Sequence, residues 1–255
     1  MLVRTLSQKE IIQVVCGSKH MMCLTSEGLV YSWGSGENGV LGHGSMSSYD
    51  KPEVIKELKM SYEIVFIAAG MFSSAAISST GQLFTWGRGK YGVLGIGSEE
   101  SVCIPTLVSN DKIKNEQIFY VSLGLYHTLA LSIDKKAFAW GYSEKGRLGC
   151  VDKIDCDQKK RITVPKEITA LNGKNLCQIY ADCHHGNRPS FINAAKPEIA
   201  AIIALTTAKI PSNLTILPIS TIPSVGALRR STPYSSLFSS RPFRIIFVVN
   251  LPCIP

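Results

Sequence analysis

The stretch "VYSWGSGENGVLGHG", residues 30–44, decides the fold because it occurs again further along the chain. It returns as "LFTWGRGKYGVLGIG" over residues 83–97 and, in part, as "AFAWGYSEKGRLGC" over residues 137–150. Successive copies are 53 and then 54 residues apart, and the same offsets relate Trp33, Trp86 and Trp140; Gly17, Gly70 and Gly124; Gly39, Gly92 and Gly146; and Gly42, Gly95 and Gly149. A fixed period of this size is typical of solenoids and propellers.

Each repeat has the pattern of about four short strands. In the second copy, apolar or alternating runs occupy residues 63–70, 73–78, 83–87 and 103–108. Short runs that are rich in β-branched and aromatic residues and bounded by glycine favour strands. One four-stranded unit cannot bury both of its faces, so such units stack around an axis. The sequence therefore predicts an all-β protein built as a partial β-propeller.

The repeated tryptophans, glycines and histidines have structural roles in this prediction. We expect Trp33, Trp86 and Trp140 to lie between neighbouring blades, where each indole N–H can find a partner. The glycines that follow them allow a positive φ and a close approach of backbones that a Cβ would obstruct. His20 and His127 occupy equivalent positions, so we expect them to tie blades together by hydrogen bonds.

Gly34, Gly36 and Gly39 have the spacing G-x-G-x-x-G, which is also the fingerprint of a dinucleotide-binding loop. Such a loop must open a helix that meets the pyrophosphate, and an acidic residue must follow about 20 positions later. Here glycine and proline occur in residues 40–57, where the helix would run, and the motif returns in the second copy. We therefore interpret these glycines as a structural turn and expect no cofactor.

Over residues 14–44 the chain resembles the regulator of chromosome condensation repeat, whose units are similar to G-x-x-H-x-x-x-L…G-x-V-Y-x-W-G-x-G-x-x-G-x-L-G. The matching residues are Gly17, His20, Leu24, Gly28, Val30, Tyr31, Trp33, Gly34, Gly36, Gly39, Leu41 and Gly42. The second copy departs with Ser73 in place of the histidine, and the third has Lys136 at the turn glycine and Ser143 in the glycine trio. The resemblance covers residues 11–150 and implies blades of a propeller that usually closes as a seven-bladed ring.

A fourth unit begins at "NLCQIYADCHHG", residues 175–186, but no Trp-Gly pair follows it. About three and a half units cannot close a seven-bladed ring, so we predict an incomplete ring. Three alternatives stay open: the chain is a fragment, it assembles with something else, or its blades leave an exposed sheet edge. The predicted repeat domain covers residues 1–185, with units at roughly 28–80, 81–135 and 136–185.

The composition changes abruptly after Gly186. Nine of the twelve prolines but only two of the 21 glycines lie from that residue onward, and prolines interrupt helices and central strands alike. We expect residues 186–255 to be a divergent, Pro/Ser-rich and largely irregular tail. The same segment holds seven basic residues and one acidic residue, so most of the net charge of +8 belongs to it. The repeats lack a basic stripe, which makes nucleic acid an unlikely partner.

No arrangement of side chains predicts catalysis or metal binding. Nothing marks a nucleophile turn such as G-x-S-x-G. The one metal-like cluster, formed by Cys177, Cys183, His184 and His185, lacks the ligand pairs two to four residues apart that structural zinc sites show. We therefore expect a protein that is not an enzyme and has no catalytic, cofactor or metal site.

The loops of a rigid propeller are suited to binding other macromolecules. The residues between the repeated glycines differ in charge and aromatic content from copy to copy, and Arg and Tyr are enriched at interface hot spots. The predicted partner-binding residues are Glu37, Asn38, Arg88, Lys90, Tyr91, Glu144 and Lys145.

The resemblance implies a noncatalytic module that binds a protein. Family members include the exchange factor of the Ran GTPase and propellers in HECT-type ubiquitin ligases. The implied activity is guanine-nucleotide exchange on, or docking of, a Ran-like small GTPase. The alternatives are a chromatin-associated or ubiquitin-ligase-associated scaffold and a truncated product without independent function. The first residues lack the apolar run of a signal peptide, and no apolar run approaches a membrane span, so we expect a cytoplasmic or nuclear protein without membrane contact.

Overall fold

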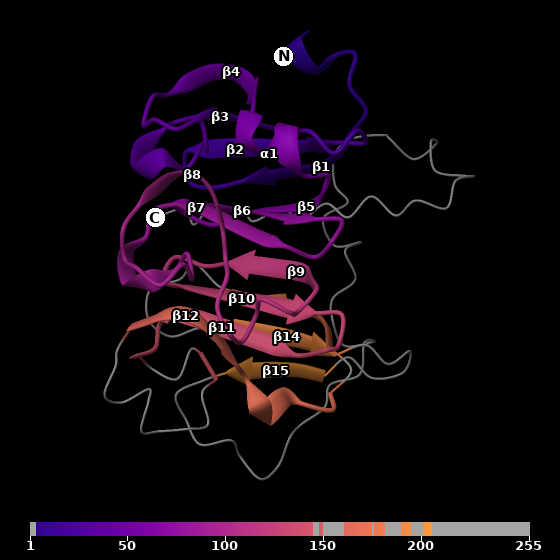
Figure 1. Cartoon of the computed structure of the whole chain (residues 1–255), viewed down its shortest axis with the longest axis vertical. Helices are drawn as coiled ribbons and strands as arrows, with labels where there is room; N and C mark the ends of the chain where they lie inside the picture. The colour runs from indigo at the N-terminus through magenta and orange to yellow at the C-terminus, as the bar shows by residue number, and fades with distance from the viewer. Residues whose placement is uncertain are drawn as a thin grey trace, which may run out of the picture.

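The computed structural model describes residues 4–144, 148–149, 161–174, 176–181, 190–194 and 201–205. In these residues the strands form antiparallel sheets that are stacked in chain order along the long axis of the molecule (Figure 1). Three sheets have four strands and the last has three, and they form an open stack. The predicted all-β, partial propeller is confirmed.

Within each sheet, every strand pairs with the next strand of the chain. The first blade contains β1 (Ile11–Cys16), β2 (His20–Thr25), β3 (Val30–Gly34) and β4 (Tyr49–Val54). The second contains β5 (Ile64–Ala69), β6 (Ser73–Ser78), β7 (Leu83–Gly87) and β8 (Val102–Leu107). The third contains β9 (Ile118–Leu123), β10 (His127–Ser132), β11 (Ala137–Tyr142) and β12 (Arg161–Glu167), and the last sheet contains β13 (Leu176–Tyr180), β14 (Ser190–Ala194) and β15 (Ala201–Leu205).

Short helices occupy the connections between strands. The 3-10 helices are η1 (Arg4–Leu6), η2 (Glu37–Gly39), η3 (Lys90–Gly92) and η5 (Thr169–Leu171). The one α-helix of the described residues, α1 (Lys56–Ser61), connects the first blade to the second and buries Leu58. No described helix is long and apolar enough to cross a membrane.

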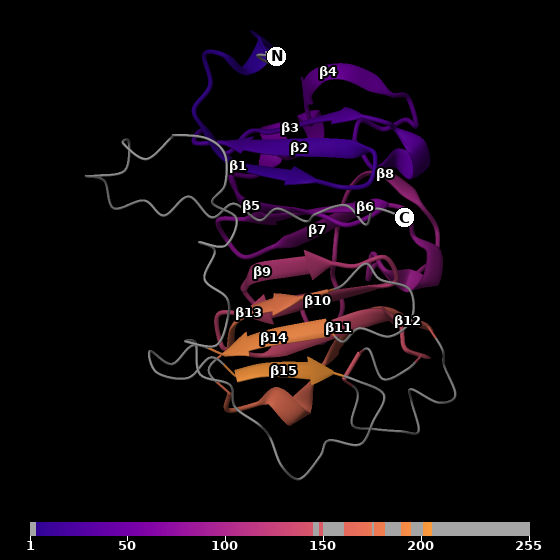
Figure 2. The same cartoon turned by 180° about the vertical axis from the view of Figure 1, so that it is seen from behind.

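The sequence repeat and the blade are out of phase. The unit predicted over residues 28–80 begins near β3, includes β4, and ends after β6 of the next blade. The first strands of the sheets, β1, β5, β9 and β13, lie next to one another in chain order (Figure 2). Each repeat therefore contributes to two blades and joins them covalently.

The hydrophobic core lies between the blades. One cluster joins Val15, Met22 and Leu24 of the first blade to Ile67 and Trp86 of the second. A second cluster joins the other side of the second blade to the third, and both β6 and β10 are buried along their whole length. Because alternate residues of a strand face opposite sides, a blade in the middle of the stack buries both faces.

Two short strands lie in the segment that the sequence predicts to be a largely irregular tail. Strands β14 and β15 come after residue 185 and extend the sheet that begins with β13, and the character of the tail as a whole stays a prediction. The isoleucine-containing stretches that form them favour strands more than their proline-rich surroundings do. The rest of residues 186–255 lies outside the described residues.

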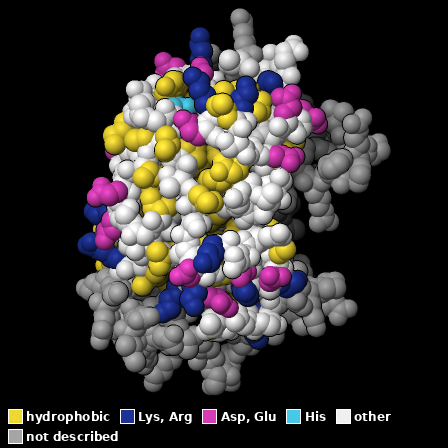
Figure 3. Space-filling view, viewed as in Figure 1, with side chains coloured by type: hydrophobic (Ala, Val, Ile, Leu, Met, Phe, Trp, Pro, Cys, Tyr) yellow, Lys and Arg dark blue, Asp and Glu magenta, His cyan; other side chains and the backbone are white. Residues whose placement is uncertain are grey.

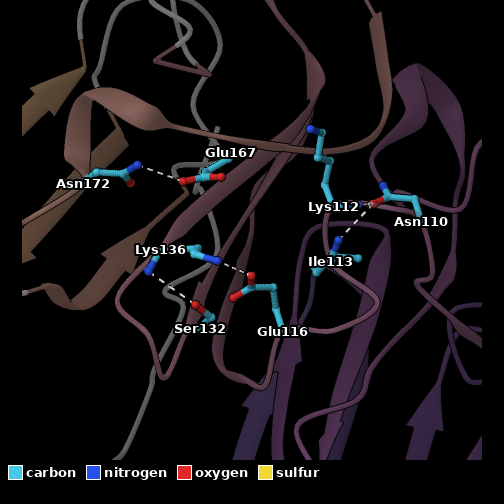
Figure 4. Close-up of polar contacts among 8 residues, drawn as sticks. All are labelled: Asn110, Lys112, Ile113, Glu116, Ser132, Lys136, Glu167 and Asn172. Carbon is cyan, nitrogen blue, oxygen red and sulfur yellow. Dashed lines mark hydrogen bonds and ion pairs between the residues drawn. The ribbon is translucent and has the colours of Figure 1, made fainter.

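One prediction from the sequence is wrong, and it concerns the turn between β10 and β11. Gly28 and Gly81 have φ angles of 76° and 81° in the equivalent turns, and Lys135 takes this left-handed position in the third blade with φ of 65°. Lys135, and not Lys136, is therefore the counterpart of the turn glycine. Lys136 forms an ion pair with Glu116 of the connection from the second blade (Figure 4).

Polar contacts at this end of the blades stabilise the connections (Figure 4). The Asn110 side-chain oxygen accepts hydrogen bonds from the backbone N–H groups of Lys112 and Ile113, at 2.8 and 3.1 Å. Asn172 donates to Glu167 at 2.9 Å. The hydrogen bond from Lys136 to Glu116 raises the pKa of the lysine. These contacts fix the chain where it passes from one blade to the next.

Candidate interaction surface

Trp86 and Trp140 lock neighbouring blades together as predicted. The Trp86 Nε1–H donates to the carbonyl oxygen of Val40 in the preceding blade at 2.8 Å, and Trp140 donates in the same way to Val93 at 2.8 Å. Both indoles are fully buried. A Cβ on Gly42 would lie 2.9 Å from Trp86 Nε1, so the indole and the glycine turn fit only without a side chain there.

The position of Trp33 corrects the prediction. Trp33 is only partly buried, whereas its counterparts Trp86 and Trp140 are 0% exposed. Trp33 belongs to the first blade, and no described blade precedes that blade in the stack. A tryptophan of this repeat is therefore buried by the turn of the blade before it and not by its own sheet.

His20 ties the first blade to the second, as predicted. Its Nε2 lies 3.0 Å from Ser74 Oγ, and Ser74 Oγ donates its one proton to the Val40 carbonyl at 2.8 Å. The serine oxygen must therefore accept from His20, which assigns the proton to Nε2. Burial lowers the pKa of His20 to about 4, so the imidazole is neutral at pH 7. His127 is buried at the equivalent place, and its role between blades stays a prediction.

Gln13 forms a second contact between blades, which the sequence analysis missed. Its side-chain nitrogen donates to the Ile67 carbonyl at 2.7 Å, and its oxygen accepts from the Ile67 N–H at 2.9 Å. The equivalent residues in the next blades are Phe66 and Tyr120, whose rings lie 5.2 Å apart. Because this position is polar in one copy and aromatic in the others, the repeat pattern does not predict the contact between Gln13 and Ile67.

One end of the blades presents the turns between first and second strands and the loops between third and fourth strands; we call it the loop face. A backbone hydrogen bond joins turn to loop in each blade: Ser35 donates to Lys19, Arg88 to Phe72 and Tyr142 to Tyr126, at 2.8, 2.8 and 2.7 Å. The same turn-to-loop hydrogen bond thus occurs in all three blades, whereas the side chains at its two residues differ.

The side chains at or close to these positions form a different interaction in each blade. In the first, Lys19 and Glu37 form an exposed ion pair at 3.6 Å. In the second, the Arg88 guanidinium lies 5.2 Å from the ring centre of Phe72, which is cation–π geometry. In the third, the rings of Tyr126 and Tyr142 are 6.1 Å apart. The character of the loop face therefore changes from charged to aromatic along the stack.

The structure brings some of the predicted binding residues together and separates others. Arg88, Lys90 and Tyr91 line a small pocket with Phe72, Ser73, Val93 and Leu125. The volume of the pocket, about 10 Å³, has room for a single water and excludes a nucleotide or other organic cofactor at this place. Glu37 and Asn38 belong to η2, one blade away. Glu144 is partly buried in the third blade, and Lys145 lies outside the described residues.

Tyr91 is the centre of an aromatic cluster that spans two blades. Its ring centre lies 5.3 Å from that of Tyr126 and 4.9 Å from that of Tyr142, and we call these three residues the tyrosine cluster. The guanidinium of Arg161 lies 5.6 Å from the centre of the Tyr91 ring. Tyr126 and Tyr142 lie 54 residues after Phe72 and Arg88, so the period of the repeat could have indicated them. The period could not show that Tyr91 contacts both.

The backbone of Tyr91 is strained. Its φ is 66°, and the equivalent Asn38 in the first blade has φ of 60°. Asn adopts this left-handed region more readily than other non-glycine residues, whereas an aromatic residue there costs about 1 kcal/mol or more. Glu99 supports the conformation: its carboxylate accepts the Tyr91 N–H at 3.2 Å and binds Arg161 at 3.1 Å. Tyr91 is thus a partly buried tyrosine whose neighbours hold it against its backbone preference.

The described residues show no metal-like site. They contain no group of three His, Cys, Asp or Glu side chains that could hold an ion, and Cys16, Cys23 and Cys103 are free thiols. Cys183, His184 and His185 of the cluster considered above lie outside the described residues, as does the side chain of Cys177.

Exposed hydrophobic side chains give no second candidate on the face seen in Figure 3. They form several separate patches there, with charged side chains between and around them. Ile104 and Leu107 on β8 and Val164 on β12 are between 39% and 45% exposed. Scattered single hydrophobic residues are normal on a protein surface.

Comparison with known proteins decides the family. The model of the regulator of chromosome condensation (RCC1) repeat matches residues 27–77, 80–131 and 134–186, and a second model of the same repeat matches residues 11–40. The chain belongs to the RCC1 repeat family. The three matched segments each begin shortly before the third strand of a blade, which is the phase difference seen in the structure.

Relatives of this RCC1 repeat chain differ widely in size and setting. It is 38% identical to the human E3 ubiquitin-protein ligase HERC2 over 170 residues. The aligned segment covers 66% of this chain and 3% of HERC2. It is 31% identical over 183 residues to the ultraviolet-B receptor UVR8 of Arabidopsis thaliana, covering 72% of this chain and 40% of the receptor. The chain thus spans less than half of either relative.

Among solved structures, Prp20p from Saccharomyces cerevisiae has the same fold. The TM-score is 0.63 at 22% identity, over 85% of this chain and 51% of Prp20p. That structure is described together with the binding of Prp20p to Gsp1p and histones. The likeness shows the fold of this chain and extends over about half of Prp20p.

Proposed function

We propose that this chain is a noncatalytic module that binds a protein through the loop face of its second and third blades. The tyrosine cluster with Arg88 and Arg161 carries the proposal. Tyr and Arg dominate the energetics of protein interfaces because they bury large areas and donate hydrogen bonds at a low entropy cost. The pocket beside Tyr91 is too small for a substrate, so the surface is suited to contact with a partner and not to chemistry.

The turn-to-loop hydrogen bond that the three blades share supports the same function. Beside this repeated bond, the first blade has an ion pair, the second a cation–π pair and the third a tyrosine pair, so a common scaffold presents a different contact in each blade. The predicted residues Arg88, Lys90 and Tyr91 are part of this surface, and Glu37, Asn38, Glu144 and Lys145 extend the proposal to the neighbouring blades.

The first partner to test is a small GTPase of the Ran type, in the cytoplasm or nucleus. Prp20p, which shares the fold, is described with its binding to Gsp1p and to histones. A nucleotide-exchange factor needs no catalytic group of its own, because it acts by binding the nucleotide-free GTPase more tightly than the loaded one. Neither a cofactor nor a membrane enters this proposal.

The experiment measures the binding of the full chain to a purified Ran-like GTPase and the rate at which that GTPase releases fluorescent GDP. Binding with accelerated release supports exchange, and binding without acceleration supports docking. A core histone preparation at several salt concentrations is the parallel sample for the chromatin alternative, since binding to a basic, DNA-associated partner depends steeply on charge. Absence of binding to the GTPase contradicts the GTPase proposal.

Tyr91→Asn is the informative variant because the first blade has Asn38 at the same position and with the same φ. It removes the ring and keeps a residue that tolerates the left-handed backbone. We expect partner binding to weaken at least about tenfold, and the melting temperature to change little. Met60→Asn, on the exposed side of α1 at the other end of the blades, is the matched control. Equal binding by both variants would contradict a role for the tyrosine cluster.

A further inference from the structure

The second blade lacks the histidine that the first and third blades have at the loop face. Where they have His20 and His127, it has Ser73. The His20 Nε2 lies 3.0 Å from the Oγ of Ser74 in the next blade, but within the described residues the shorter Ser73 makes no such bond to Thr128, the counterpart of Ser74. Ser73 is only 3% exposed, and its hydroxyl has no hydrogen-bond partner in the described part of the chain.

Ser73 lines the small pocket beside Tyr91, which we call the serine pocket. The other lining side chains are apolar or aromatic, apart from Arg88 and Lys90. The pocket has room for one water-sized group. A buried hydroxyl normally has a hydrogen-bond partner, so a hollow of this size at Ser73 suits the acceptor atom of a ligand.

The two cations of the serine pocket keep their positive charge. The Arg88 guanidinium and the Lys90 Nζ lie 5.2 and 5.0 Å from the centres of aromatic rings, which attract a cation without neutralising it. Neither cation forms an ion pair with a described residue. Of the two carboxylates in the same loop, Glu99 is held by Arg161 at 3.1 Å, and Glu100 forms no ion pair within the described residues.

The charge at the position of Lys90 is reversed in the neighbouring blades, where Glu37 and Glu144 occupy the same place in the repeat. In the first blade Glu37 pairs with Lys19 at 3.6 Å, so the charges of the loop face cancel there. The missing imidazole and the reversed charge coincide at the serine pocket. The second blade therefore has a positive hollow with a free hydroxyl, which matches a negatively charged acceptor.

We propose that the serine pocket binds the carboxylate of an aspartate or glutamate side chain of the partner protein. The inference rests on the proposed function and deepens it, because it names the chemistry that the partner presents to the loop face. One carboxylate oxygen accepts from the Ser73 hydroxyl, and the other faces Arg88 and Lys90. Hydrogen bonds to an ionised group are stronger than those between neutral groups, and opposite charges also steer the approach of the partner. A planar carboxylate suits a hollow of this size better than a phosphate does.

The experiment measures the binding of hexaglutamate, with blocked ends and a fluorescent label, to the full chain by fluorescence anisotropy. Hexaglutamine with the same label has no carboxylate, and we expect it to bind at least about tenfold more weakly. The sequence from Gly186 onward is basic and also attracts an acidic peptide. The comparison of variants therefore decides the result, because all of them retain that sequence.

Lys90→Glu gives the second blade the residue that the first blade has at this position. We expect it to raise the dissociation constant of hexaglutamate about tenfold. Lys59→Glu is the matched control, because it changes the net charge by the same amount on exposed α1, at the other end of the blades. It should change the dissociation constant less than about twofold. Equal weakening by the two variants overturns the proposal, as does equal binding of hexaglutamine and hexaglutamate.

Ser73→His tests the pocket itself, because it restores the imidazole of the other blades and fills the hollow. Gly17 leaves the space that the His20 ring occupies, and its counterpart Gly70 is also a glycine, so the backbone can accept the ring. We expect hexaglutamate binding to weaken about tenfold, and about fivefold in Ser73→Ala, which removes only the hydroxyl. Circular dichroism melts show that each variant is folded. Unchanged binding in both folded variants overturns the proposal.

This experiment and the GTPase experiment fail independently. Hexaglutamate that binds through the serine pocket supports the carboxylate site even where the GTPase does not bind. A GTPase that binds wild type and Ser73→His equally, while hexaglutamate distinguishes none of the variants, overturns the carboxylate site and leaves the loop face as the binding surface.

Discussion

The first and second blades have the same order of strands and turns, but a described blade precedes only the second one in the stack. Trp86 is buried against the glycine turn of the first blade and donates to Val40, whereas Trp33 is partly exposed and no described blade precedes it in the stack. The comparison shows that a residue of this repeat is buried by its neighbour in the stack. Stability is therefore a property of pairs of blades, as in other repeat proteins.

The largest expected difference between the two blades concerns these tryptophans. Trp86→Ala should lower the free energy of unfolding by about 3–5 kcal/mol, because it removes a fully buried indole and leaves a cavity. Trp33→Ala should cost only about 1–2 kcal/mol, since part of the side chain is already in contact with water. Urea denaturation followed by circular dichroism measures both.

Trp140→Ala serves as the control, because Trp140 makes the same hydrogen bond one blade further on and should behave like Trp86. Equal losses for Trp33→Ala and Trp86→Ala would contradict the view that burial comes from the preceding blade.

The strands, the turns and the lock at Trp86 and Trp140 could be predicted because they depend on residue types that recur at a fixed period. Gln13 could not be predicted, because its bond to Ile67 depends on one polar residue at a position that is aromatic elsewhere. The tyrosine cluster is partly predictable: Tyr91 was expected at the surface, but its contact with Tyr126 and Tyr142 depends on how two blades are placed. Helix α1 has six residues, too few for a periodic pattern to show.

The second expected difference is the pH dependence that His20 gives to the contact between the first and second blades. Burial holds the pKa of His20 at about 4, against an ordinary value of 6.5, so the unfolded chain binds its proton first as pH falls. Stability from this residue is complete above about pH 6.5 and is lost between there and about pH 4. The full loss is about 3 kcal/mol, measured as the free energy of unfolding against pH.

His20→Gln is the control for this effect. The amide keeps a donor near Ser74 but does not titrate, so the loss of stability between pH 6.5 and pH 4 should become smaller. Burial also lowers the pKa of His43, which contributes in the same direction in both proteins and cancels in the comparison. The same pH profile for variant and wild type would contradict the assignment to His20.

The smallest difference separates two glycines of the same loop. Gly42 and Gly44 both have a left-handed backbone, with φ of 76° and 80°, but a Cβ on Gly42 would lie 2.9 Å from Trp86 Nε1, whereas one on Gly44 would lie 3.8 Å from Ile104. Gly44→Ala should therefore cost only the backbone strain, about 1 kcal/mol. Gly42→Ala should cost about 1–3 kcal/mol more, because the buried indole must move and lose its bond to Val40. Equal losses in urea denaturation would mean that φ alone requires these glycines; a larger loss for Gly42→Ala would show that the turn of one blade is shaped by the tryptophan of the next.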